Sequence, residues 1–125
     1  MSTTRLIEVE LFVADVERAV ALYRDVLDLP LEGHAHAEGD PVHHHAAWGD
    51  WDAGADGFLL FSIFPARPGE VTRASLGFRV PDLDAVHRRL ESAGAKVVHP
   101  PETRPWGRAA TYQDADGNIV SLTEA

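Results

Sequence analysis

Apolar and polar side chains alternate along residues 6–13, at the start of the chain. Because successive side chains on a strand point to opposite faces, this alternation predicts a β-strand with one buried face. We expect the side chains on one face to pack against a helix and those on the other face to line a cavity. The helix-facing side chains are Val9, Leu11 and Val13, and the cavity-facing ones are Leu6, Glu8, Glu10 and Phe12.

The spacing of the apolar residues changes directly after this strand. From Asp15 onward they recur at helical intervals through Tyr23, which predicts a helix with one buried side. Asp15 is a favourable N-cap, and Pro30 ends the helix because proline has no backbone N–H. A segment rich in His and Gly then covers residues 31–52, and a nearly continuous apolar run at residues 57–65 has the length and composition of a strand.

The same order of elements returns in the second half of the chain. Residues 75–80 predict a strand, and Asp82 is placed to cap a second helix. Gly94 lies where helices commonly end in a left-handed residue. Turn residues separate three further strand candidates, at residues 95–99, 107–114 and 118–123.

Two short motifs recur at equivalent places in these two halves. The sequence VADV at residues 13–16 corresponds to VPDL at residues 80–83. The sequence ADG at residues 55–57 corresponds to ADG at residues 115–117. Both recurring motifs fall at the boundaries of predicted elements, so they indicate an internal repeat.

The repeat predicts an α+β fold of two βαβββ modules. They cover residues 1–65 and 71–125 of a single domain spanning residues 1–125. Each module alone is too small to close a core. We therefore expect the modules to pack together, with their curved mixed sheets around a shared cleft.

Composition and charge exclude several classes of protein. The net charge is −9 and the basic residues are scattered, which argues against binding to nucleic acid or to an anionic membrane surface. No apolar run approaches the roughly 18 residues of a membrane span, and no signal peptide is recognisable. The chain has no cysteine, which excludes disulfides and thiolate chemistry and favours a cytoplasmic location.

Four segments together resemble the vicinal oxygen chelate superfamily, which includes glyoxalases, bleomycin resistance proteins and extradiol dioxygenases. They are VADVERAVALYRDVLDLP at residues 13–30, LGFRVPDLDA at 76–85, PWGR at 105–108 and DADGNIV at 114–120. Each segment alone is a weak signal, but all four in this order cover nearly the whole chain. The resemblance implies paired βαβββ modules, a cavity enclosed by the sheets, and a homodimer.

The resemblance also implies a metal site that this chain lacks. Catalytic members of the family hold a divalent ion on four side chains, and the motifs place these positions at Glu8, at Leu60 or Phe61, at Ser75 and at Ser121. Hydrocarbon side chains cannot coordinate a metal, and a neutral serine is a poor ligand. We therefore expect no metal and no other cofactor at the family position, with a site made of Glu8, His43 and His45 as the minor alternative.

The predicted cavity still carries candidate ligand-binding residues. Glu8 lies on an otherwise apolar wall, where it is either a buried structural hydrogen-bonding group or a ligand-contacting acid or base. The aromatic residues are placed either to stack on a planar ligand or to pack in the core. The candidates are Glu8, Phe12, His43, His45, Trp48, Phe61, Ser75, Trp106, Tyr112 and Ser121.

Two kinds of function remain open. The first is metal-independent binding of a small hydrophobic or aromatic molecule, such as an antibiotic or another natural product, with the acidic balance favouring a cationic ligand. The second is an enzyme, a glyoxalase-like lyase or isomerase or a dioxygenase, that uses Glu8 as a general base or recruits a metal through Glu8 and the clustered histidines. The poor set of metal ligands favours metal-independent binding.

His87 and His99 are expected at the surface.

Overall fold

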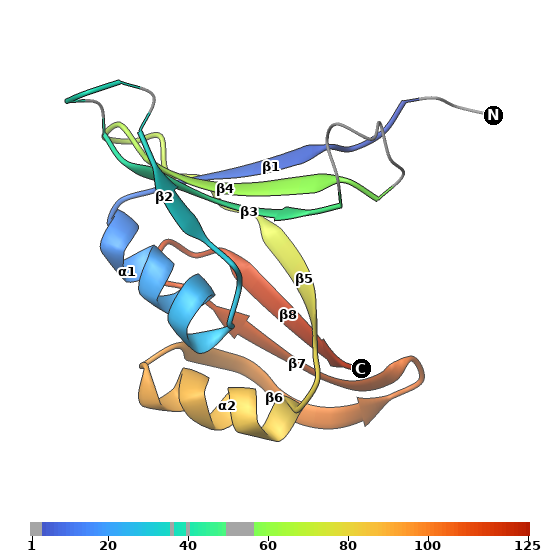
Figure 1. Ribbon diagram of the computed structural model, residues 1–125. Coiled ribbons are helices and arrows are strands. Elements are labelled where there is room, and N and C mark those ends of the chain that lie inside the picture. The colour runs from blue at the N-terminus through green and yellow to red at the C-terminus, as the bar shows by residue number, and fades with distance from the viewer. Residues whose placement is uncertain (1–3, 36, 40, 50–56) are drawn as a thin grey trace.

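The computed structural model describes residues 4–35, 37–39, 41–49 and 57–125, and within them the chain forms two four-stranded mixed sheets (Figure 1). The α+β class is confirmed. The first sheet has the order β1-β4-β3-β2, and its strands are β1 (Glu8–Val13), β2 (Glu32–His34), β3 (His43–Trp48) and β4 (Leu59–Pro65). The second has the order β5-β8-β7-β6, with β5 (Ser75–Val80), β6 (Lys96–Arg104), β7 (Gly107–Gln113) and β8 (Ile119–Glu124).

The connectivity of the first module is repeated in the second. In each, the first strand runs parallel to the fourth, and the other pairs are antiparallel. Glu8 lies beside Leu60 in the first sheet, and Ser75 lies beside Ile119 in the second. The first repeated motif, at residues 13–16 and 80–83, lies at the strand-to-helix junction of both modules. In the second repeated motif, residues 55 and 56 lie outside the described residues.

Both predicted N-caps are confirmed by hydrogen bonds at the starts of the helices. An Asp15 carboxylate oxygen accepts from the backbone N–H of Arg18 at 3.1 Å, ahead of α1 (Val16–Val20). Asp82 accepts from the backbone N–H of Ala85 at 3.1 Å, ahead of α2 (Leu83–Ser92). The first helix widens into a π-helical segment, η1 (Ala21–Val26), a detail that apolar spacing does not reveal.

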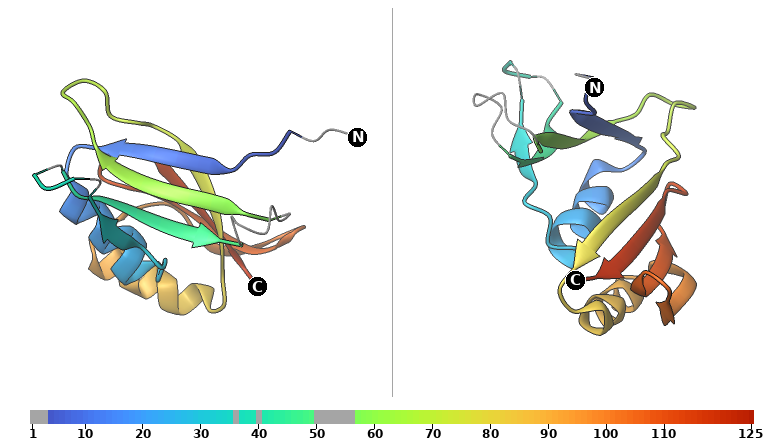
Figure 2. Two further views of the ribbon diagram at one scale, coloured as in Figure 1. Left: turned by 45° about the horizontal axis from the view of Figure 1, so that its top comes forward. Right: turned by 90° about the vertical axis from the view of Figure 1, so that its right-hand side faces the viewer.

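One common core joins the two modules, and Tyr23 of η1 lies at its centre. Its fully buried ring contacts Phe61 of β4 at 5.6 Å and Phe78 of β5 at 6.2 Å between ring centroids. Its hydroxyl donates to a carboxylate oxygen of Asp114 at 2.7 Å, just beyond β7. The sides of both sheets that are covered by helices therefore face the same core, and each sheet's other side, here called its open face, lies on the outside of the molecule (Figure 2).

This arrangement differs from the expected shared cleft in one respect. Glu8 is exposed on the open face of the first sheet, and Ser75 and Ser121 are exposed on the open face of the second. The helix-covered sides of both sheets face one core. The two open faces therefore point away from each other and do not meet within one chain. The sequence pattern identified the faces but could not determine their mutual orientation.

The acidic turn at residues 114–118, before the last strand, is a hydrogen-bonded connection. Asp114 accepts from the backbone N–H groups of Asp116 and Asn118 at 3.0 and 2.8 Å. The fully buried Asn118 side chain in turn accepts from the backbone N–H of Ala74 at 2.7 Å, just ahead of β5. The carboxylate of Asp114 thus completes a local turn and binds the hydroxyl of Tyr23.

Two features of the second module differ from the sequence prediction. Strand β6 extends through Pro100 and Pro101, which an edge strand tolerates because only one of its sides is paired. His87 is not a simple surface residue, because its Nδ1 lies 2.7 Å from the hydroxyl of Tyr112 and its Nε2 lies 2.8 Å from Glu91. No helix among the described residues has the length and apolar character needed to cross a membrane.

Alkaline titration of the two tyrosines tests this core. Burial, followed by the charges of Glu91 and Asp84, raises the pKa of Tyr112 to about 12 from its ordinary value of 10.0. Burial and the hydrogen bond to Asp114 raise the pKa of Tyr23 further. Because the folded state disfavours the phenolate, stability is unaffected below the ordinary pKa and falls as the pH rises toward the raised values.

Tyr23 and Tyr112 are the only tyrosines in the sequence, so ultraviolet difference spectroscopy reports on them alone. We expect no phenolate signal near the ordinary pKa while the protein is folded, and the Tyr112→Phe variant should remove the earlier of the two transitions. A tyrosine that ionises near its ordinary pKa in the native protein would contradict the packing described.

Candidate functional site

The open face of the first sheet gathers polar and aromatic side chains from three strands. It consists of Glu8, Glu10 and Phe12 of β1, Ser62 and Phe64 of β4, and His43 and His45 of β3, and is called the first open face below. Strand register brings them together, because Glu10 lies beside Ser62, Phe12 beside Phe64, and His45 opposite Ser62. The alternation seen at residues 6–13 thus extends across the sheet.

A buried serine links the polar groups of the first open face. The hydroxyl of Ser62 is 0% exposed and lies 2.6 Å from Nδ1 of His45. The same hydroxyl donates to Oε2 of Glu8 over a long 3.5 Å. A hydroxyl that donates to the carboxylate must accept from the imidazole, which assigns the proton of His45 to Nδ1. The chain from His45 through Ser62 thus reaches the exposed carboxylate of Glu8 through a contact at the limit of hydrogen-bonding distance.

An aromatic shelf lies next to this chain of hydrogen bonds. Phe12 stacks on Phe64 with ring centroids 5.4 Å apart, and Phe64 stacks on His43 at 4.7 Å with 12° between the planes. His45 meets His43 edge-on at 4.4 Å. Phe12 is 38% exposed, so the end of the shelf on β1 is open to a binding partner. Such a surface suits a flat apolar molecule.

The two glutamates of β1 influence each other. Desolvation against the strand surface, the negative charge of Glu8 and a hydrogen bond with it together raise the pKa of the Glu10 carboxyl. Two like charges on one strand face are unfavourable, and a cation bound between them relieves the repulsion. The electrostatics of this face therefore favour a positively charged group.

The structure brings only part of the predicted set together. Glu8, Phe12, His43 and His45 share the first open face, whereas Ser75 and Ser121 lie on the open face of the second sheet. The remaining aromatic candidates have separate positions: Trp48 at the end of β3, Phe61 in the core against Tyr23, Tyr112 buried against His87, and Trp106 at the tip of the β6–β7 turn, where it is 69% exposed.

Sequence reasoning placed Glu10 on the cavity side without naming it as a candidate, and it missed Ser62. The period-two pattern that selected Glu8 and Phe12 also selects Glu10, so that signal was present. Ser62 and Phe64 lie inside the continuous apolar run, which carries no alternation and so does not reveal which residues share a face.

The residues at the family's metal position do not fit a divalent ion. Glu8 and Leu60 lie on one sheet and Ser75 and Ser121 on the other, so the set offers one carboxylate, one hydrocarbon and two neutral hydroxyls. In the alternative set, Nδ1 of His45 is already engaged with Ser62, and the ring of His43 is packed flat on Phe64. Within the described part of the chain, no three His, Cys, Asp or Glu residues form a group that could hold a metal.

Comparison with known proteins identifies the family. The model of the Glyoxalase/Bleomycin resistance protein/Dioxygenase superfamily matches residues 5–122, and the chain belongs to this superfamily. A putative ring-cleaving dioxygenase, MhqA of Bacillus subtilis (strain 168), is 28% identical over 131 residues. That match covers 98% of this chain but only 41% of the relative's length.

Two solved structures share the fold over nearly their whole length. TnmS3, an antibiotic binding protein from Streptomyces sp. CB03234, is 25% identical with a TM-score of 0.67, and the match covers 99% of this chain and 98% of that chain. TioX from Micromonospora sp. ML1 is 23% identical with a TM-score of 0.68, and the match covers 97% of this chain and 98% of that one. The predicted superfamily and fold are thus confirmed.

The Glu10→Gln variant tests the electrostatics of the first open face. Because the pKa of Glu10 is raised, its ionised form lowers the stability of the folded protein at pH values above the ordinary pKa of 4.5. Its protonated form does not lower that stability. The variant should therefore be more stable than the wild type near neutral pH, with the gain disappearing as the pH falls below the ordinary pKa. Urea unfolding at both pH values measures the difference.

Glu17→Gln serves as the control for this variant. Glu17 is an exposed glutamate in the first turn of α1, where the helix dipole favours its charge. Its replacement should be neutral or slightly destabilising near neutral pH. Equal stability changes in the two variants, or a Glu10→Gln effect that does not depend on pH, would contradict the interpretation.

Proposed function

We propose that this protein binds a small hydrophobic or aromatic molecule at the first open face without the help of a metal ion. The observation that carries the proposal is the stacked shelf of Phe12, Phe64 and His43 beside the hydrogen-bonded carboxylate of Glu8. The shelf supplies a flat apolar contact. The carboxylate supplies one directional polar contact, which is the usual composition of a small-molecule site.

The charge of this face indicates the kind of ligand. Glu8 and Glu10 are both acidic, and the whole chain carries a net charge of −9. An aromatic molecule with a cationic or strongly hydrogen-bond-donating group satisfies the carboxylates while its ring lies on the shelf. A carboxylic acid or phosphate at the same place would be repelled.

We further propose that a second copy of the chain completes the site. The first open face is a single wall, and enclosing a ligand requires another surface opposite it. The open face of the second sheet, with Ser75 and Ser121, is available only from another chain, because both open faces point outward within one chain. Arg79 is exposed on the same strand as Ser75 and offers a charge opposite to that of Glu8 and Glu10. These features support a homodimer.

The relatives support a natural product as the ligand. TnmS3 is an antibiotic binding protein with the same fold over nearly its whole length. An antibiotic or a similar polycyclic molecule fits a site that relies on stacking and on one or two carboxylates. Sequestration of such a molecule is the role that we propose.

An enzymatic function is the second candidate, favoured by the chain of hydrogen bonds from Glu8 through Ser62 to His45. Such a chain can position a carboxylate as a general base. The similarity to a putative ring-cleaving dioxygenase gives it further support. The donor set argues against a metal-dependent reaction, and metal analysis of the purified protein tests that form of the enzyme: stoichiometric iron, manganese, nickel or zinc would favour a metal-dependent reaction.

Binding of 2-naphthylmethylammonium, measured by isothermal titration calorimetry, tests the proposed site. Glu8→Gln removes the charge-assisted contact and Phe12→Ala removes the exposed ring of the shelf. Each should weaken binding by about tenfold, the equivalent of roughly 1.4 kcal/mol. Glu17→Gln and Val98→Ala, which alter exposed residues elsewhere, should leave the affinity unchanged. Equal affinities for all four variants, or no binding to the wild type, would contradict the proposal.

A further inference from the structure

A groove between the two modules lies on the side of the first sheet that faces the core, away from the first open face. It has a volume of about 940 Å³, within the range of pockets that hold drug-sized molecules, roughly 300–1,000 Å³. Val9, Trp48 and Leu59 line it from the first sheet, and Leu76 and Phe78 line it from the second. All five remain at least partly exposed, so apolar surface is open to a ligand here.

Strand alternation determines which side chains of β5 enter this groove. Leu76 and Phe78 lie on the helix-covered side of the second sheet, where the ring of Phe78 lies 6.2 Å from that of Tyr23. Gly77 and Arg79 also border the groove, but they alternate with these residues, and the side chain of Arg79 belongs to the open face of the second sheet. The charge inside the groove therefore comes from residues outside β5.

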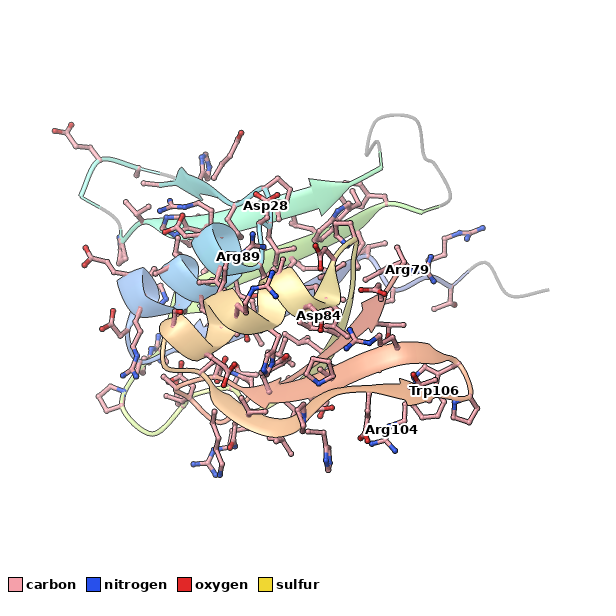
Figure 3. The ribbon with its side chains drawn as sticks, turned by 90° about the horizontal axis from the view of Figure 1, so that it is seen from below. Asp28, Arg79, Asp84, Arg89, Arg104 and Trp106 are labelled. Carbon is pink, nitrogen blue, oxygen red and sulfur yellow. The ribbon has the colours of Figure 1, made fainter. Side chains whose placement is uncertain are left out.

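Among the described residues, the other charged groups that line the groove are Asp28, Asp82 and Arg89. Asp82 is committed to the start of α2, because its Oδ1 accepts from the backbone N–H of Ala85 at 3.1 Å. This leaves Asp28, which follows η1, and Arg89 on α2. Figure 3 shows these two where the end of η1 lies beside α2, whereas Arg79 lies beyond the N-terminal end of α2.

Asp28 and Arg89 are opposite in charge and share one groove, yet they are not paired. Both are exposed, and neither forms an ion pair or a side-chain hydrogen bond with any described residue. A carboxylate and a guanidinium group are thus both available to a ligand. A molecule that carries an ammonium group and a carboxylate matches both of them.

The backbone of Asp28 indicates that its carboxylate has a role. Its φ of 62° is the only positive φ of a residue other than glycine in the described part of the chain. Glycine is the usual residue at such a left-handed position after a helix, because a Cβ atom is crowded there. Aspartate tolerates this conformation when its side chain forms a local hydrogen bond, and Asp28 forms none with the described residues. An acid therefore lies at the groove despite the backbone strain.

We infer that the groove binds a zwitterionic molecule with an aromatic ring, of which an aromatic amino acid is the simplest example. Its ammonium group pairs with Asp28, and its carboxylate pairs with Arg89 through the two parallel hydrogen bonds that a guanidinium group offers. Its ring packs on Leu76 and Phe78. The site lies within a single chain, and the inference does not depend on the proposal for the first open face.

Titration with tryptophan, followed by amide NMR spectroscopy, tests the place of binding. Tryptophan should bind to the wild type and shift the amide signals of Leu29, Leu76 and Arg89, which belong to the groove. The amide signals of Glu10 and His45, on the first open face, should stay in place. The Glu8→Gln variant should bind tryptophan as the wild type does, which separates this inference from the proposed function.

Indole-3-propionate, which has the ring and the carboxylate of tryptophan but no ammonium group, tests the assignment of the two charges. Asp28→Asn should weaken tryptophan binding about fivefold and leave indole-3-propionate unaffected, whereas Arg89→Gln should weaken both about fivefold. Glu17→Gln and Arg88→Gln, which change exposed residues that do not line the groove, are the matched controls and should bind both compounds normally.

The Asp28→Gly variant separates a role in binding from a role in folding. Glycine adopts the left-handed conformation without strain, so the thermal unfolding midpoint should rise by a few degrees while tryptophan binding weakens as it does in Asp28→Asn. The inference is overturned if tryptophan fails to bind at millimolar concentration or shifts the first open face instead. It is equally overturned if Asp28→Asn and Arg89→Gln both bind tryptophan as the wild type does, or if folded Asp28→Gly retains full affinity.

Discussion

The packing of both modules around the side chain of Tyr23 is the constraint on which the rest of the structure depends. Its fully buried ring contacts strands from both sheets, and its hydroxyl is bound by Asp114 of the second module. A buried hydroxyl without this acceptor would cost about 1–3 kcal/mol, so the two groups hold the modules in one relative orientation. That orientation turns the open face of each sheet outward.

Two surfaces of opposite character follow from this single arrangement. The first open face joins an aromatic shelf to the carboxylates of Glu8 and Glu10, whereas the open face of the second sheet carries Ser75, Arg79 and Ser121. The common core separates them, because both sheets turn their helix-covered sides toward it.

The sequence predicted what local periodicity can encode. The alternation on β1 assigned Glu8 and Phe12 to one face correctly, and the N-caps Asp15 and Asp82 were identified because a side-chain oxygen is needed at a helix start. In the apolar run of β4, both faces are hydrophobic, so nothing local distinguished Phe61, which faces the core, from Ser62 and Phe64, which face outward. The contact between His87 and Tyr112 depends on how α2 lies on the second sheet, which is a tertiary feature.

The orientation of the open faces also lay beyond the sequence. The internal repeat defined two modules, but it is equally compatible with open faces that meet within a chain and with open faces that meet only between chains. The two sheets are oriented so that their more apolar sides are buried against each other. In this chain those are the sides that carry Phe61 and Phe78. The proposal that a second copy encloses the ligand therefore rests on how the core packs.

Electron–electron distance measurement between spin labels introduced at Glu8 and Ser121 examines this account most directly, since the chain has no native cysteine to interfere. In fully labelled protein, we expect a short separation between the first open face of one copy and the second open face of another. Co-refolding with an excess of unlabelled chain should remove that short separation and leave only the longer one within a chain. A short separation that persists after this dilution would show that the open faces meet inside one chain and would contradict the account.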